Sequence, residues 1–204
     1  MTTPELLRPV DPEAPLLVVA TRQEAEHLSA DLPILLTGIG RINTVAALTE
    51  VLADVKPTSV INIGTAGSLG SASGVHRVGS VLLHDFSHSA VADLTGGVAY
   101  PPITLADDGP VLATGDLFVE DSATRVRLAE IADLVDMEGY AVAWVARRHG
   151  VPVELIKLVS DPAGEDAGRL WIDGVAECSR ILDAHLAERF SGLAAGVSAG
   201  GRRR

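Results

Sequence analysis

The chain has 204 residues, of which 47% are hydrophobic, and this length suits one domain with a sizeable buried core. Its formal net charge of −11 argues against nucleic acid as a partner, because affinity for a phosphate backbone depends on clustered lysines and arginines. Cys178 is the only cysteine, no apolar run approaches the ~20 residues needed to cross a bilayer, and the first residues lack a signal-peptide pattern, so we expect a cytoplasmic protein with no membrane partner.

Short apolar segments alternate along the chain with segments of helical spacing. Residues 1–15 carry four prolines and no periodicity, which predicts a flexible N-terminal arm. Apolar runs of strand length predict strands at 15–20, 78–86, 111–116, 134–138 and 151–161. Residues 32–40 and 58–67 each predict a strand that leads into a glycine-containing turn. Apolar residues at helical spacing predict helices at 41–55, 122–132, 139–150 and 171–190. Residues 191–204 are rich in glycine and alanine and predict a flexible C-terminal tail.

This alternation predicts an α/β fold with a mostly parallel sheet covered by helices on both faces. In such sheets ligands bind beyond the carboxyl ends of the strands. Glu24, Glu138 and Asp161 each follow an apolar strand, so we expect the three carboxyl groups to converge on one crevice.

Each of these acids also has a purely structural interpretation. Glu24 lies three residues after Thr21 and can complete a capping box, whereas Glu138 lies at a helix start, where the macrodipole favours an acid. Asp161, which follows Ser160, can simply cap a strand end. The functional alternative for Asp161 is a carboxyl group that donates a proton to a substrate.

Two further motifs predict neither a cofactor nor a metal ion. Residues 37–43, TGIGRIN, resemble a dinucleotide fingerprint only in part, because Asn43 replaces the third glycine. His84 and His88 are spaced as helical metal ligands, but their segment is expected to be strand and loop, which would not place them on one face. The glycines of GIG and of GTAG (64–67) are expected in turns that let backbone approach a ligand.

Five motifs in order resemble the methylthioadenosine/S-adenosylhomocysteine nucleosidases of the nucleoside phosphorylase superfamily, over residues 16–190. They are TGIGRINTVAAL, INIGTAGSLG, TGDLFVED, VDMEGYAVAWVA and LVSDPAG. The resemblance implies a single catalytic domain at 16–190, built as a three-layer sandwich around a central mixed, mostly parallel sheet. It also implies hydrolysis of the N-glycosidic bond of a 5′-modified adenine nucleoside, such as methylthioadenosine or S-adenosylhomocysteine, by a homodimeric enzyme.

The resemblance further implies a role for each matched residue. Asp161, beside Ser160, would protonate the purine N7, and Glu24 would orient and deprotonate the attacking water. Glu138 would accept hydrogen bonds from the ribose hydroxyls. The remaining implied contacts are Met137 on the sugar, Phe118 and Val119 at the base, Thr65, Ala66 and Gly67 on the ribose side, and Ile39 and Trp171 at the 5′ substituent.

Three alternatives remain open. A phosphorylase needs a cationic phosphate site, yet Asn62 stands where its arginine would lie, which leaves Arg22 and Arg41 as other cations. A futalosine-type hydrolase is possible because SADLP (29–33) replaces the family's hairpin and the segment after HDFSH is altered. A non-catalytic nucleoside-binding protein would not need a water-activating Glu24.

Overall fold

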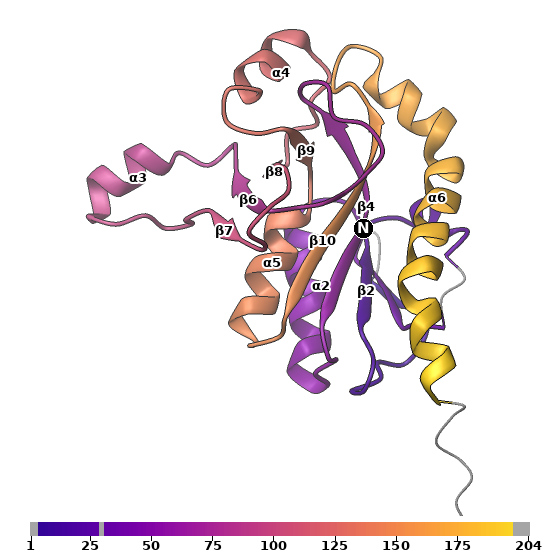
Figure 1. Ribbon diagram of the computed structural model, residues 1–204. Helices are drawn as coiled ribbons and strands as arrows, with labels where there is room; N and C mark the ends of the chain where they lie inside the picture. The colour runs from indigo at the N-terminus through magenta and orange to yellow at the C-terminus, as the bar shows by residue number, and fades with distance from the viewer. Residues whose placement is uncertain (1–3, 29–30, 198–204) are drawn as a thin grey trace, which may run out of the picture.

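The computed structural model describes residues 4–28 and 31–197, in which strands and helices alternate as expected (Figure 1). The strands are β1 (Glu5–Leu6), β2 (Leu16–Val19), β3 (Ile34–Leu36), β4 (Val60–Ser68), β5 (Val75–Arg77), β6 (Ser80–Leu83), β7 (Ile103–Thr104), β8 (Val111–Thr114), β9 (Leu134–Asp136) and β10 (Val153–Asp161). The helices are α1 (Arg22–Ala25), α2 (Arg41–Asp54), α3 (His88–Thr95), α4 (Ser122–Leu128), α5 (Gly139–Arg148) and α6 (Ala167–Val197).

These strands form one mixed sheet across the described part of the chain. Its main order is β1-β3-β2-β4-β9-β8-β6-β7, and β10 joins it by pairing with β4 and β5. The inner pairs β2–β3, β2–β4, β4–β10, β6–β8 and β8–β9 are parallel. Antiparallel pairing occurs in β1–β3, β4–β9, β6–β7 and β5–β10. The expected α/β fold with a central mixed sheet is therefore confirmed.

Helices cover both faces of this sheet and make three layers. The four residues of β2 are all buried, and their side chains alternate between two cores, as in a strand covered on both sides. One core contains Leu16 and Val18 with the apolar residues of α2 and α5. The other contains Leu17 and Val19 with those of α1 and α6. Figure 1 shows α6 on one side of the sheet and α2 and α5 on the other.

Several elements differ from the sequence-based expectations. Residues 5–6 of the expected arm form β1, which pairs with β3, and α6 continues through the start of the expected tail to Val197. The GTAG segment is not a turn, because it lies inside β4. Parts of three predicted segments, residues 1–3 of the arm, 29–30 of SADLP and 198–204 of the tail, lie outside the described residues.

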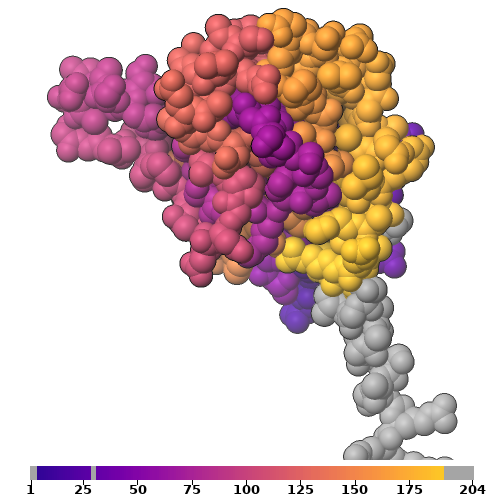
Figure 2. Space-filling model, turned by 45° about the horizontal axis from the view of Figure 1, so that its top comes forward, coloured from indigo at the N-terminus to yellow at the C-terminus, as the bar shows by residue number. Residues whose placement is uncertain are grey.

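An unexpected helix, α3, stands apart from the sheet. His88 begins it, so HDFSH continues into a helix, and Gly96 ends it in the left-handed conformation with φ 73°. None of its residues is buried. Figures 1 and 2 show this segment projecting from the body of the molecule as an arm between β6 and β7. The sequence gives no strong signal for it because α3 has no face packed on the core.

The central strand β4 has an edge that is only partly paired. On one side, β10 runs beside β4 along nearly its whole length, from Val60 to Gly67. On the other side, β2 pairs only with its start, Val60–Asn62, and β9 only with its end, Gly67–Ser68. On that side, the backbone groups of residues 63–66 are not paired with another described strand. They face α1, the element that follows β2 and carries Glu24.

Candidate active site

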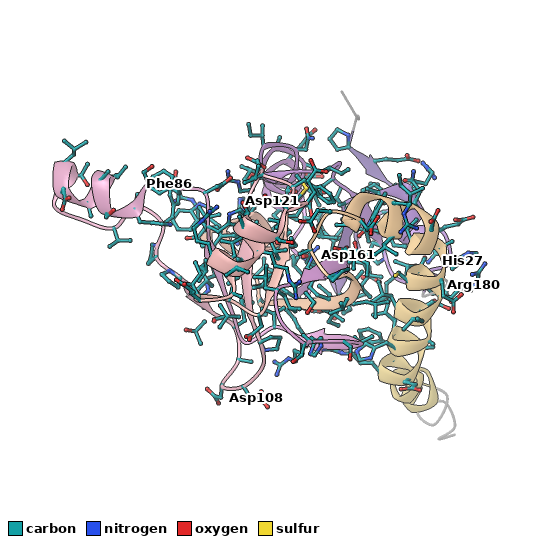
Figure 3. The ribbon with its side chains drawn as sticks, turned by 90° about the horizontal axis from the view of Figure 1, so that it is seen from above. His27, Phe86, Asp108, Asp121, Asp161 and Arg180 are labelled. Atoms are coloured by element: carbon teal, nitrogen blue, oxygen red, sulfur yellow. The ribbon has the colours of Figure 1, made fainter. Side chains whose placement is uncertain are left out.

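One pocket lies at the carboxyl ends of β2, β4, β9 and β10. Its empty volume is about 750 Å³, which includes the solvent space at its open mouth. Every residue expected in the site lines it: Glu24, Ile39, Thr65, Ala66, Gly67, Phe118, Val119, Met137, Glu138, Ser160, Asp161 and Trp171. Ala20, Thr21, Leu117, Val135, Asp136 and Ala163 complete the lining. The convergence expected from the strand ends is therefore present. Figure 3 views this end of the molecule and shows Asp161 between α4 and α6.

Glu24 is held by donors on both of its carboxylate oxygens. Its Oε2 accepts hydrogen bonds from the Thr21 backbone N at 3.2 Å and from Thr21 Oγ1 at 3.0 Å, which completes the expected capping box of α1. Its Oε1 accepts from the backbone N and the Oγ1 of Thr65, at 2.9 and 2.8 Å. Glu24 is thus a helix cap and, at the same time, a carboxylate bound to the open edge of β4.

Glu138 lies at the start of α5 and is almost completely buried. Its Oε1 accepts a 2.7 Å hydrogen bond from the backbone N of Gly40, in the GIG turn between β3 and α2. Gly40 has φ 91°, a conformation that favours glycine, so this turn is as the sequence indicates. Burial, followed by the negative charge of Asp136, raises the pKa of Glu138 to about 8.

Asp161 ends β10, where the pairing with β4 is irregular. Its Oδ2 accepts a 2.7 Å hydrogen bond from Ser160 Oγ, and its Oδ1 accepts from the backbone N of Ala163 at 2.9 Å. Ala163 adopts φ 47°, a left-handed conformation that is uncommon for alanine and places its N–H toward the carboxylate. The side chain is therefore oriented by the turn that follows the strand.

A buried ion pair lies near Glu24 and Glu138, and sequence reasoning missed it. Lys157 Nζ is 2.8 Å from Asp136 Oδ2, and both side chains are 2% exposed. Burial lowers the pKa of Lys157, but the carboxylates of Asp136 and Glu138 outweigh it and raise that pKa overall. The available signal was the lysine itself, because a charge inside the apolar strand VELIKLV requires a buried partner.

The glycines of β4 allow close contact without forming a turn. A Cβ atom on Gly64 would lie 3.0 Å from Glu24 Oε1, and one on Gly67 would lie 3.3 Å from Asp161 Oδ1 and 2.9 Å from the Cβ of Ala163. The expected loop is wrong, because these glycines lie in an extended strand. Their missing side chains leave room for the carboxyl groups of Glu24 and Asp161 beside the strand.

Among the described residues that line the pocket, none is a lysine or an arginine. Arg41 is bound to Asp116 and Asp85, each at 2.9 Å, and Arg22 pairs with Glu5 on the surface. Asn62 is buried within β4 and donates to the Val18 carbonyl. Arg22 and Arg41, the two cations considered as phosphate ligands, are therefore paired with acidic residues that do not line the pocket.

The rim of the pocket is apolar, with Ile39, Leu117 and Phe118 each exposed by 42–52%. In the described ranges, no cluster of three or more histidine, cysteine or acidic side chains could hold a metal ion, and no helix is long and apolar enough to span a membrane. The site offers carboxylates around a half-open apolar cleft. This arrangement can bind a flat apolar ring while placing acids beside a developing positive charge.

Comparisons with known proteins identify relatives of this chain. A family model described as the phosphorylase superfamily matches residues 103–190. The chain is 30% identical over 164 residues to a 5′-methylthioadenosine/S-adenosylhomocysteine nucleosidase of Marinomonas sp. (strain MWYL1), covering 67% of this chain and 71% of that protein. A protein of the same name from Bacillus cereus (strain G9842) is 32% identical over 169 residues, covering 66% and 69%.

Solved structures share the fold. A Helicobacter pylori nucleosidase variant with 5′-methylthioadenosine in its active site matches with a TM-score of 0.77 and 20% identity, covering 88% of this chain and 99% of that one. Futalosine hydrolase from Helicobacter pylori also matches with a TM-score of 0.77 and 20% identity, covering 86% and 96%.

Proposed function

Because the chain belongs to the 5′-methylthioadenosine/S-adenosylhomocysteine nucleosidase family, we propose that its pocket binds a 5′-modified adenine nucleoside and hydrolyses it. The protein is an N-glycosyl hydrolase that releases the base and a free sugar. The observation that carries this function is the convergence of Glu24, Glu138 and Asp161 in one pocket whose described lining holds no cationic side chain.

The three carboxyl groups divide the reaction between them. Water attacks C1′ of the ribose as the bond from C1′ to N9 breaks, and the sugar passes through an oxocarbenium-like state with positive charge. Asp161 gives a proton to N7, so that the base leaves as a neutral molecule. Glu24 orients the water and takes its proton, while Glu138 accepts hydrogen bonds from the ribose hydroxyls and stabilises the positive charge.

The other lining residues place the nucleoside. Phe118 stacks on the purine, the backbone of Val119 reads its edge, and Met137 packs on the sugar. The small residues of β4, from Thr65 to Gly67, lie along the ribose, and Ser160 orients Asp161 through its hydrogen bond. The 5′ substituent lies toward Ile39 and Trp171, at the apolar rim of the pocket.

Hydrolysis is favoured over phosphorolysis by the charges around the site. A phosphate nucleophile needs cationic donors, and Arg41 and Arg22 are already paired with acids. Glu24 would also repel a bound anion. A non-catalytic binding protein is disfavoured because the donors of Thr21 and Thr65 hold Glu24 in place, which nucleoside binding alone does not require.

The deciding experiment is a nucleoside panel incubated with and without millimolar phosphate. We expect 5′-methylthioadenosine or S-adenosylhomocysteine to give adenine and the free sugar at a rate that phosphate does not increase. Futalosine belongs in the panel because a futalosine hydrolase shares the fold. A sugar 1-phosphate detected by mass spectrometry, with little turnover in the absence of phosphate, would make the protein a phosphorylase.

We further propose that the protein acts as a homodimer in the cytoplasm. Ile42 and Val45 are exposed by 81% and 40% on the first turns of α2, next to the apolar rim of the pocket. An apolar patch of this kind marks a contact surface, and a second copy of the chain would cover it. The single Cys178 is buried and unpaired, which fits a reducing compartment.

A further inference from the structure

We propose that Trp171 is a positioning residue for the base Glu24 and acts through Thr65. Trp171 Nε1 donates a 2.9 Å hydrogen bond to Thr65 Oγ1, and Thr65 Oγ1 donates a 2.8 Å hydrogen bond to Glu24 Oε1. The chain of contacts thus runs from α6 through β4 to α1. This inference rests on the proposed function, because it assigns Glu24 the role of base.

The indole fixes the direction in which the Thr65 hydroxyl points its proton. An indole N–H is a donor only, so Thr65 Oγ1 must accept from Trp171. A hydroxyl carries one proton, and the remaining partner of Thr65 Oγ1 is the carboxylate of Glu24. Without the indole N–H, the hydroxyl is free to turn its proton elsewhere. The contact with Trp171 therefore secures one of the two donors on Glu24 Oε1.

Glu24 needs this support because its own helix is short. The helix α1 has four residues, too few to be stable alone, and its position depends on what it contacts. Besides the apolar packing of Ala25 and Leu28 with α6, two hydrogen-bonded links to α6 anchor this region. The His27 backbone N donates to Ser179 Oγ at 2.9 Å, and the route through Thr65 reaches Trp171. The first holds the chain just after α1, and the second holds the carboxylate itself.

An aromatic residue at position 171 can have two separate roles. Any aromatic ring at 171 fills space beside the 5′ substituent and affects how tightly the nucleoside binds. Only tryptophan supplies an N–H to Thr65 in the observed geometry. Trp171→Phe keeps most of the ring and removes that donor, so it tests the second role while largely sparing the first.

The test measures kcat and KM for adenine release from 5′-methylthioadenosine by the full-length protein. Losing one hydrogen bond of ~0.5–1.5 kcal/mol in the transition state corresponds to a fall of about two- to twelvefold in kcat, and we expect KM to change less. Trp144→Phe is the matched control: it removes an indole N–H from α5, away from the pocket, and should leave kcat unchanged.

A double-mutant cycle with Thr65 shows whether Trp171 acts through it. Thr65→Val removes the hydroxyl at nearly constant shape, whereas Thr65→Ser keeps it, so the serine variant should retain a higher kcat than the valine variant. In the Thr65→Val background, Trp171→Phe should cause no further loss of kcat. Circular dichroism melting of each variant checks that it folds, and the Thr65 pair tests the hydroxyl even if Trp171→Phe does not fold.

The outcomes are distinguishable. Equal losses from Trp171→Phe in the wild-type and Thr65→Val backgrounds would overturn the positioning role, as would an effect confined to KM that varies with the 5′ group. Thr65→Ser and Thr65→Val with the same kcat would also overturn it. If the wild-type protein releases no base from any nucleoside of the panel, the proposed function fails, and the positioning role fails with it.

Discussion

The three carboxyl groups of the pocket differ in their hydrogen-bond partners, and their proposed roles differ accordingly. Glu24 accepts four hydrogen bonds from two threonines, which fix the position of the carboxylate proposed to act as the base. Asp161 accepts two from the turn that follows it. Glu138 accepts one in the described structure and lies near Asp136, so its neutral form is favoured before substrate arrives.

Asp161→Asn should lower kcat for adenine release by about 10²–10⁴-fold while the protein remains folded. The amide oxygen can still accept from the Ala163 backbone N, so the turn is kept, but the side chain cannot deliver a proton to N7. Rates of base release and a circular dichroism melt measure the two effects. Near-normal turnover in a folded variant would show that another group supplies the proton.

Glu138→Gln should change how stability depends on pH. The pKa of Glu138 rises from 4.5 to about 8 on folding, so between these values the folded protein holds a proton that the unfolded chain has lost. Its contribution is fully present below about pH 4.5 and is lost as the pH rises toward 8, so the free energy of unfolding falls. Glutamine has no such proton to lose.

Urea unfolding at pH 5 and at pH 8 measures this difference. The glutamine variant should gain stability relative to wild type between the two pH values, by on the order of a few kcal/mol. A difference between wild type and variant that is the same at both pH values would contradict the raised pKa. Measurement at pH 5 serves as the internal control for any change in packing.

The strand β10 carries both the residue proposed as the catalytic acid and a buried charge. Asp161 stands at its end, and Lys157 stands in its middle, paired with Asp136 at the end of β9. Asp136 also accepts hydrogen bonds from Thr114 Oγ1 and from the Gly139 backbone N, so it joins β8, β9, β10 and α5. Asp136, which lines the pocket, therefore connects three strands and a helix through this ion pair and these hydrogen bonds.

Lys157→Met should cost about 3–5 kcal/mol in the free energy of unfolding, because it leaves the buried Asp136 without its counter-charge. Lys56→Met is the matched control: that lysine donates to the His149 carbonyl on the surface, and its loss should cost less than about 1 kcal/mol. Urea titrations of both variants give the comparison. Equal stability of the Lys157 variant and wild type would show that the ion pair is not a major support.

The elements that bury a run of apolar residues could be predicted, whereas the shortest strands and the exposed helix could not. The fully buried runs LLVV of β2 and LVD of β9 stand out in the sequence, and each leads to an acid of the site. The strands β1 and β7 have two residues each, too few for a periodic pattern, and the exposed helix α3 has no buried residue that would mark a core-facing side. The pair of Lys157 with Asp136 depends on how β10, β4 and β9 lie side by side, which spacing along the chain does not reveal.

The hydrogen bond between Trp171 and Thr65 illustrates the same limit within the site. The resemblance placed both residues near the ribose and its 5′ group, and both line the pocket. That they contact each other follows only from how α6 begins beside β4. Residue types indicate which chemistry is available, whereas the contacts decide which group orients which.

We propose that the homodimer buries the apolar patch of Ile42 and Val45 on α2, and this proposal can be tested directly. Wild type should sediment at about twice the chain mass of 21.2 kDa, whereas Ile42→Asp should sediment nearer to the mass of one chain. A charge placed in an apolar interface is costly because it loses its water without gaining a partner. Val126→Asp, at an exposed apolar position on α4, is the control and should not change the mass. A wild-type protein that sediments as a single chain would contradict the dimer.

The late arrival of β10 has a consequence for how the protein is made. During synthesis β4 emerges with one of its edges still unpaired, because its partner along that edge begins roughly 85 residues later. At ribosomal speeds of about 5–20 residues per second, this edge stays open for several seconds. An open apolar strand is a template for pairing with other chains. Nascent molecules are therefore most prone to aggregate before β10 appears, and crowded translation at high expression should reduce the yield of active protein.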